Sequence, residues 1–185
     1  TDAEILAYIH QFRDDNIFAI AELFARGITV EQIHDITQIT PFFLEAILKI
    51  VEMEEKLKKN PGNEKILLEA KRMGFSDKYV ARMWECTELE VFKFRKEHNL
   101  FPVFRMVDTC HTGAYIPYFY SSYTGENTSV LTNRKKIVVL GAGPIRIGQG
   151  VEFDYSTVHA VTTIKNAGYE AIIINNNPET VSTDY

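Results

Sequence analysis

The chain has little cysteine and no long apolar run, and these absences exclude whole classes of protein. Its only two cysteines, Cys86 and Cys110, form no CxxC pair, so neither a disulfide scaffold nor a zinc module is encoded. No stretch approaches the roughly 18 apolar residues of a membrane span. Acidic residues stand near the N-terminus, where a signal peptide would carry basic ones. We therefore expect a cytoplasmic protein with no membrane partner.

An excess of charge of one sign is also missing. The 20 Lys and Arg residues against 25 Asp and Glu give a net charge of −5 over 185 residues, so nucleic acid is not an expected partner. Hydrophobic residues at 45% and aromatic residues at 12% are typical of a chain with a folded core. The length suits one domain with a partial second. Because the chain begins without Met and stops directly after a predicted strand, we expect it to be a piece of something longer.

Helical periodicity extends over residues 16–98, and helix caps divide it into separate helices. The predicted starts are Asp14 or Asp15, the capping box at Thr29, and Thr40-Pro41. Gly27 is placed to end the first helix in a left-handed conformation. The helix after Thr40 should be the longest, and the NPGN sequence at 60–63 ends it.

The sequence matches itself when shifted by 47 residues, which predicts a duplicated helical unit. Gly27, Thr29, Ile33, Thr40 and Leu44 fall on Gly74, Ser76, Val80, Thr87 and Val91. Each copy reads as helix, glycine, hydroxyl cap, short helix, threonine cap, helix, and both TVEQ (29–32) and TELE (87–90) are capping boxes. Two copies are too few for a solenoid, so we expect two small bundles packed together.

Helical periodicity ends near residue 100, and an extended aromatic segment follows at 103–123. Residues 103–107 alternate like a short strand, and residues 115–123 contain five aromatic side chains around a proline. The rings are expected to cover a surface, and an aromatic ligand cage is the alternative.

From residue 135 the pattern is that of one βαβ unit. Residues 136–140 and 171–174 are short apolar runs, typical of parallel strands buried on both faces. Between them, Asp154 or Ser156 caps a predicted helix that Gly168 ends. The predicted fold class is mainly α, as duplicated small bundles, followed by an incomplete α/β unit of a doubly wound sheet.

The loop GAGPIRIGQG (141–150) lies between strand and helix, where dinucleotide-binding loops also occur. Arg146 replaces the third glycine of GxGxxG, and the second strand ends in asparagines instead of the acidic residue that binds a ribose. These departures disfavour a nicotinamide or flavin site.

Two interpretations of this loop remain open. Arg146 can bind an anion, with Glu179 of the next loop beside it. Alternatively, the two residues form an ion pair that ties the loops together.

Other candidate sites are weaker. The helix spacing at 29–50 and 76–97 permits a helix-turn-helix module that binds DNA or protein, but residues 41–50 are mostly apolar and 88–97 balance three acids with three bases. Cys110-His111 has no third partner for nucleophilic catalysis. The histidines neither pair at i,i+4 nor cluster with cysteine, so no metal site is expected.

The glycine loop extended to GAGPIRIGQGVEFDY (141–155), with NNPETVSTDY (176–185), closely resembles the start of the second synthetase half of the carbamoyl-phosphate synthase large chain. Upstream, NIFAIAE (16–22), TVEQIH (29–34), GFSD (74–77) and VDTC (107–110) resemble the central oligomerisation domain of that family. The resemblance covers nearly the whole chain. Residues 111–114 (HTGA) depart from the family pattern, and the stretch is about two residues shorter than in the family, so contacts made by it are not carried over.

The resemblance implies a ligase that makes carbamoyl phosphate from bicarbonate, glutamine-derived ammonia and two ATP, for pyrimidine and arginine biosynthesis. It implies ATP, Mg²⁺ or Mn²⁺ and K⁺ as cofactors of the parent enzyme, and a glutaminase small chain as partner. No cofactor-binding, metal-binding or catalytic residue is expected in this piece itself. Arg146, Gly150 and Glu179 are implied to line the carbamate tunnel.

The resemblance also implies a division of the chain. Residues 1–133 form an oligomerisation and connector domain that self-associates, and residues 134–185 form a truncated pre-ATP-grasp piece.

Overall fold

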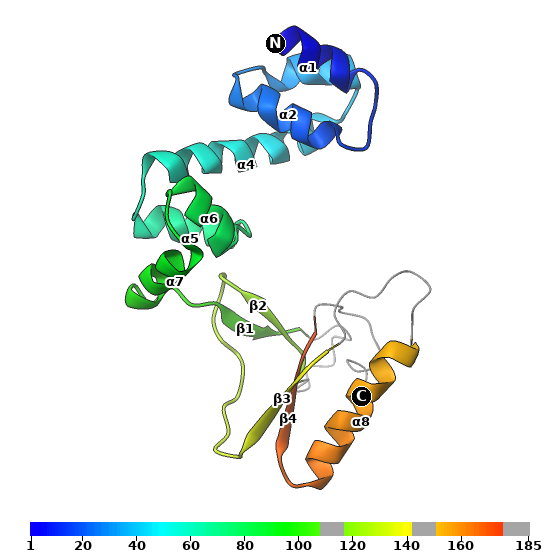
Figure 1. The fold of residues 1–185 in the computed structure, drawn as a ribbon, viewed down its shortest axis with the longest axis vertical. Helices are drawn as coiled ribbons and strands as arrows, with labels where there is room; N and C mark the ends of the chain where they lie inside the picture. The colour runs from blue at the N-terminus through cyan, green and yellow to red at the C-terminus, as the bar shows by residue number, and fades with distance from the viewer. Residues whose placement is uncertain (108–116, 142–150, 176–185) are drawn as a thin grey trace. The chain divides into compact units, whose positions relative to one another are not determined.

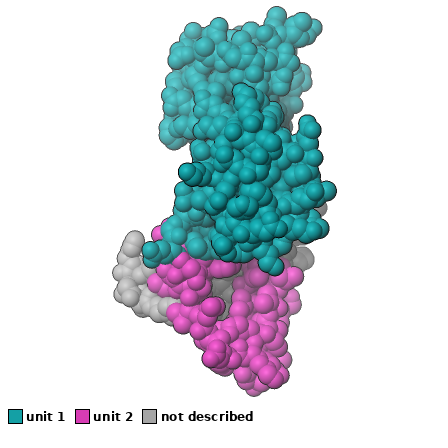
Figure 2. Space-filling view, turned by 90° about the vertical axis from the view of Figure 1, so that its left-hand side faces the viewer, with its two compact units in different colours: residues 1–103, 121–126 teal, residues 104–120, 127–185 magenta. Residues whose placement is uncertain are grey.

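The structure is a computed structural model that describes residues 1–107, 117–141 and 151–175. Contacts divide the chain into two compact units, coloured separately in Figure 2. The first comprises residues 1–103 and 121–126, and the second comprises residues 104–120 and 127–185. The described part is mainly helical and ends in a small α/β element (Figure 1). The predicted fold class is therefore confirmed.

The first bundle contains α1 (Asp2–Ile9), α2 (Asn16–Ala25), α3 (Val30–Thr37) and the first part of α4 (Pro41–Lys59). The Thr29 capping box and the left-handed Gly27, with φ of 88°, form as predicted. Helix α1 was not predicted, although Thr1 and Glu4 form a capping box at its start. Neither Asp15 nor Thr40 makes a side-chain capping bond, so these two starts rest on backbone geometry and on Pro41.

The second bundle repeats this arrangement, which confirms the duplication. Helices α5 (Glu64–Arg72), α6 (Asp77–Met83) and α7 (Glu88–Glu97) correspond to α2, α3 and the start of α4 after the 47-residue shift. Side chains of Ser76 and Thr87 cap α6 and α7, and Gly74 has φ of 93°. The two copies thus share local backbone geometry as well as sequence pattern.

Helix α4 is long because it contributes to two separate cores. Leu44 and Val51 belong to the core of the first bundle, and Met53 and Leu57 to the core of the second. At 100° per residue, Val51 and Met53 point in roughly opposite directions. One helix therefore supplies two apolar stripes on different faces.

Strands β1 (Val103–Met106) and β2 (Phe119–Ser122) form a two-stranded sheet within the region predicted to be extended. The Val107 amide donates to the Tyr118 carbonyl at 3.0 Å. Tyr118 and Tyr120 meet edge to face, and Tyr120 is exposed. Tyr118, Phe119 and Tyr123 are half-buried, as expected of rings that cover a surface.

The βαβ unit consists of β3 (Lys136–Leu140), α8 (Val151–Asn166) and β4 (Glu170–Ile174), with β3 and β4 parallel. Helix α8 begins at Val151, ahead of the predicted caps Asp154 and Ser156, and Asp154 is buried. The prediction that both faces of these strands are buried is also wrong for the described residues. Val138, Leu140, Ile172 and Ile174 share one face by alternation and register, and all four are exposed. On the opposite face Val139, Ala171 and Ile173 are half-buried, and α8 packs against both strands.

Candidate functional site

The carboxyl ends of β3 and β4 form the edge at which ligands of parallel sheets bind. The Gly141 amide donates to the Ile174 carbonyl at 2.8 Å, so the pairing continues past the end of β3. A Cβ on Gly141 would lie 2.7 Å from both Cγ and Nδ2 of Asn175. Only glycine fits here without displacing Asn175, so the first glycine of the loop has a steric role.

The predicted tunnel residues Arg146, Gly150 and Glu179 lie outside the described residues, as do Cys110 and His111. The segments that contain the three tunnel residues follow Gly141 and Asn175. Because β3 and β4 are parallel, both segments start from the same edge of the sheet. Within the described ranges the structure therefore fixes where these segments begin.

A buried ionic cluster in the second bundle is the principal polar site that the sequence reasoning missed. Asp77, at the start of α6, accepts hydrogen bonds from Arg95 Nε at 2.9 Å and from Lys71 Nζ at 2.9 Å. Lys71 also donates to the Phe75 carbonyl, and Arg95 donates to the Leu100 carbonyl. Lys71 and Arg95 are buried, so each cation needs these acceptors.

Burial works to raise the pKa of Asp77, but the hydrogen bonds from Arg95 and Lys71 outweigh it and keep that pKa below its ordinary value. Tyr123 covers the cluster. Its ring centroid lies 5.2 Å from Lys71 Nζ and 5.8 Å from Arg95 Cζ, and its carbonyl accepts from Arg72 Nε at 3.4 Å. Burial raises the pKa of Tyr123 as well. The cluster thus attaches the segment 121–126 to the helices.

The internal repeat contained a signal for this cluster. Lys71, Asp77 and Arg95 fall on Phe24, Val30 and Leu48 after the 47-residue shift. Three charges at positions that are apolar in the other copy indicate a buried polar site, because a buried charge requires a partner.

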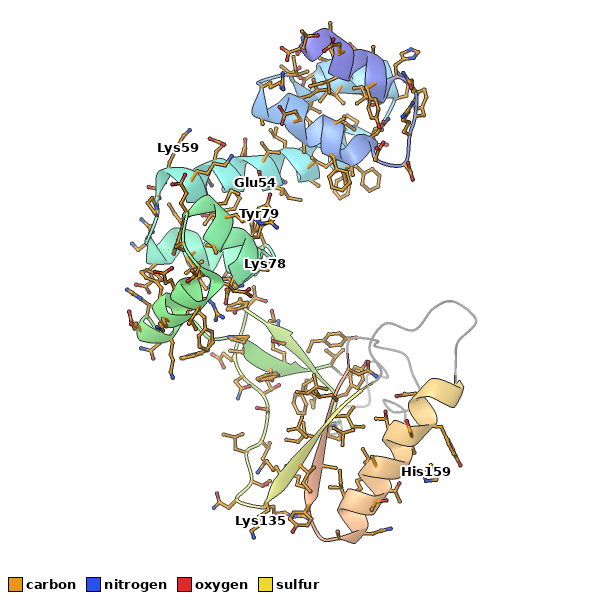
Figure 3. All side chains as sticks on the ribbon, in the orientation of Figure 1. Glu54, Lys59, Lys78, Tyr79, Lys135 and His159 are labelled. Carbon is orange, nitrogen blue, oxygen red and sulfur yellow. The ribbon has the colours of Figure 1, made fainter. Side chains whose placement is uncertain are left out.

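A second polar contact joins α4 to α6. Tyr79 donates a short hydrogen bond to Glu54, and Figure 3 shows the two side chains directed toward each other. Burial, followed by this bond, raises the pKa of Tyr79 to about 12. The phenol therefore remains a donor at neutral pH.

The helical unit also exposes many large apolar side chains. On the first bundle these are Phe12, Ile17, Phe18, Phe42, Phe43 and Ile50. Phe42 and Phe43 contact each other edge to face at 5.4 Å. An exposed apolar pair of this kind suits a protein interface better than contact with water.

The described residues hold no group of three side chains suited to bind a metal ion. In the same part of the chain, no helix has the length and hydropathy needed to cross a bilayer.

Comparison with protein families matches both parts of the chain. Residues 1–99 match the oligomerisation domain of the carbamoyl-phosphate synthetase large chain. Residues 133–185 match the carbamoyl phosphate synthase preATP-grasp domain. The first match alone covers more than half of the chain and includes both helical bundles. The chain therefore belongs to the carbamoyl-phosphate synthase large-chain family.

Proposed function

We propose that this chain is the central part of a carbamoyl-phosphate synthase large chain, which connects the two synthetase halves and mediates self-association. The observation that carries the proposal is the order of the two family matches, an oligomerisation domain at residues 1–99 and then a preATP-grasp domain at residues 133–185. The helical unit and the βαβ unit appear in that same order. We place the boundary between residues 133 and 134.

The parent enzyme would make carbamoyl phosphate from bicarbonate, ammonia and two ATP in the cytoplasm, for pyrimidine and arginine biosynthesis. It would need Mg²⁺ or Mn²⁺ and K⁺, and a glutaminase small chain would supply ammonia. This chain alone would not be catalytic. The mass of the native polypeptide tests this assignment: a chain several times larger than 21.2 kDa supports it, and a native chain of this size contradicts it.

Within the parent enzyme, Arg146, Gly150 and Glu179 would line the carbamate tunnel. Glycine at 150 leaves the passage wide, and Arg146 with Glu179 would stabilise a labile anion in a space that excludes water. The shared strand edge at Gly141 and Asn175 supports this, because both loops start from it.

A bulky side chain tests the tunnel. In the complete synthase, Gly150→Phe should reduce carbamoyl phosphate synthesis at least about tenfold while glutaminase and bicarbonate-dependent ATPase activities continue. Gly150→Ala is the matched control and should have a much smaller effect. Full synthesis by Gly150→Phe would contradict the tunnel role.

Self-association is supported by the exposed apolar side chains of the first bundle. Sedimentation equilibrium of the 185-residue chain should show a dimer or larger species at micromolar concentration. A monomer throughout that range would contradict this role. The helix-turn-helix alternative gains no support, because the exposed side chains at the start of α4 include Phe42 and Phe43 where a recognition helix needs polar and basic groups.

A further inference from the structure

The two helical copies differ at one equivalent site, which is covered in the second copy and open in the first. In the second copy, Tyr123 rests on Lys71, Arg72 and Arg95. The 47-residue shift places these three residues on Phe24, Ala25 and Leu48. Phe24, Ala25 and Leu48 line an open groove of about 480 Å³, here called the α2–α4 groove. Its other lining residues are Val51, Glu52, Glu55, Lys56, Lys59 and Asn60.

The backbone around the two sites has the same shape, so the equivalence is structural. Left-handed residues occur at matching positions, Gln38 with φ of 56° and Glu85 with φ of 54°. The Ile28 amide donates to the Leu23 carbonyl at 3.0 Å, and its counterpart bond in the second copy is 3.1 Å long. The α2–α4 groove is therefore the counterpart of the Tyr123 site, and none of the described residues fills it.

The chemistry of the groove indicates which side chain it accepts. Phe24, Ala25 and Leu48 replace the three cations of the second copy, so the floor suits a purely apolar ring. Helix α4 extends beyond the position where α7 ends and supplies a charged rim. Glu55 pairs with Lys58 and Lys59, and Lys56 pairs with Glu69. Among the described residues Glu52 forms no ion pair, so it is available to a cation that enters beside the ring.

The chain carries a segment of this kind in the loop between α1 and α2. Phe12 is 65% exposed and has φ of 51°, a conformation rare for phenylalanine. Arg13 follows it, and its guanidinium contacts the ring of Tyr8 and the side chain of Gln11 but no carboxylate in the described part of the chain. A loop lets the ring and the cation turn toward one surface.

Two other exposed pairs are less suited. Phe104 and Arg105 lie on strand β1, where adjacent side chains point to opposite faces. Phe92 and Lys93 lie on helix α7, about 100° apart around its axis.

We propose that the α2–α4 groove accepts Phe12 of a second copy of this chain, with Arg13 of that copy paired to Glu52. The proposal rests on the self-association proposed above and identifies the contact through which it occurs. Phe12 is then the buried anchor of the interface and the Arg13–Glu52 pair lies at its rim.

Sedimentation equilibrium of the 185-residue chain tests the contact. Phe12→Ser should raise the dissociation constant of the dimer at least about tenfold, as expected for loss of an aromatic anchor. Ala25→Arg should do the same by filling the groove. An arginine is tolerated at this position of the fold, because Arg72 occupies it in the second copy. Phe101→Ser is the matched control, an exposed ring in the second bundle, and should leave the constant unchanged.

A charge exchange tests the partner residue directly. Arg13→Glu and Glu52→Arg should each weaken the dimer severalfold, and the two together should restore most of the affinity. A dimer that is unaffected by both Phe12→Ser and Ala25→Arg would overturn the groove contact and leave self-association intact. A wild-type monomer would overturn both. Weakening by only one of these two variants would also overturn the contact, because ring and groove must act together.

Discussion

At the scale of single residues, the second bundle keeps a buried ionic cluster where the first has apolar side chains. Removing one partner of a buried ion pair is strongly destabilising, because it leaves an uncompensated charge. Asp77→Asn leaves Lys71 and Arg95 without a carboxylate and should lower the free energy of unfolding by about 3 kcal/mol. Urea denaturation followed by Trp84 fluorescence measures this.

The matched control replaces the whole cluster by its counterpart. Lys71→Phe, Asp77→Val and Arg95→Leu together reproduce Phe24, Val30 and Leu48 of the first bundle. Because apolar residues often replace a buried ion cluster without loss, this triple variant should be more stable than Asp77→Asn. If the triple variant were less stable than Asp77→Asn, the unpaired charges would not be what destabilises Asp77→Asn.

Acid should weaken the same cluster. The folded pKa of Asp77 lies below the unfolded value near 3.8, so its contribution is complete above that pH and is lost as pH falls through the folded pKa. As pH falls below about 4, wild type should lose more stability than Asp77→Asn. Parallel loss in both proteins would contradict the assignment.

For Tyr79 we expect the opposite pH dependence of stability, a loss in alkali. Its folded pKa of about 12 lies above the ordinary 10.0, so its contribution is complete below pH 10 and is lost as pH rises toward 12. Tyr79→Phe should cost about 1 kcal/mol at pH 8 and should flatten the decline above pH 10. Urea denaturation at pH 8 and above pH 10 measures the effect. Glu54→Gln, which changes the acceptor of the same hydrogen bond, is the companion variant.

At the scale of helices and strands, the two copies provide a matched pair of glycines. Gly27 and Gly74 have φ near +90°, and a Cβ on either would meet no atom within 4 Å. Alanine at each position should therefore cost about 1 kcal/mol through backbone conformation alone. Equal losses in Gly27→Ala and Gly74→Ala, additive in the double variant, are expected in urea denaturation. A large difference would mean that the two helix ends are not equivalent.

Local chemistry explains which elements were predictable. The Thr29 and Thr87 capping boxes and the left-handed glycines depend on neighbouring residues, so they were predicted and are confirmed. Helix α1 has the same kind of start at Thr1 and was overlooked. The Lys71–Asp77–Arg95 cluster joins α5, α6 and α7, and helix spacing alone does not predict such a tertiary contact. The prediction that both faces of β3 and β4 are buried was wrong for a related reason, because the composition of a strand does not show what covers it.

At the scale of the whole molecule, the two units differ in how much core each possesses. Both large apolar clusters belong to the first unit. In the second unit, Val158 is the one buried aliphatic side chain among the described residues. Because buried apolar area is the main source of stability, the second unit should unfold at lower denaturant than the first.

The single tryptophan makes the separation measurable. Trp84 follows α6 in the first unit, so its fluorescence reports that unit, whereas far-ultraviolet circular dichroism also includes α8. The dichroism transition should begin at lower urea than the fluorescence transition. Leu67→Ala, in the core of the second bundle, should lower the free energy of unfolding reported by fluorescence by about 3 kcal/mol. It should leave the part of the dichroism transition at lower urea unchanged. Coincident transitions in wild type would instead mean that the α/β unit gains its stability from the helical unit and does not fold separately.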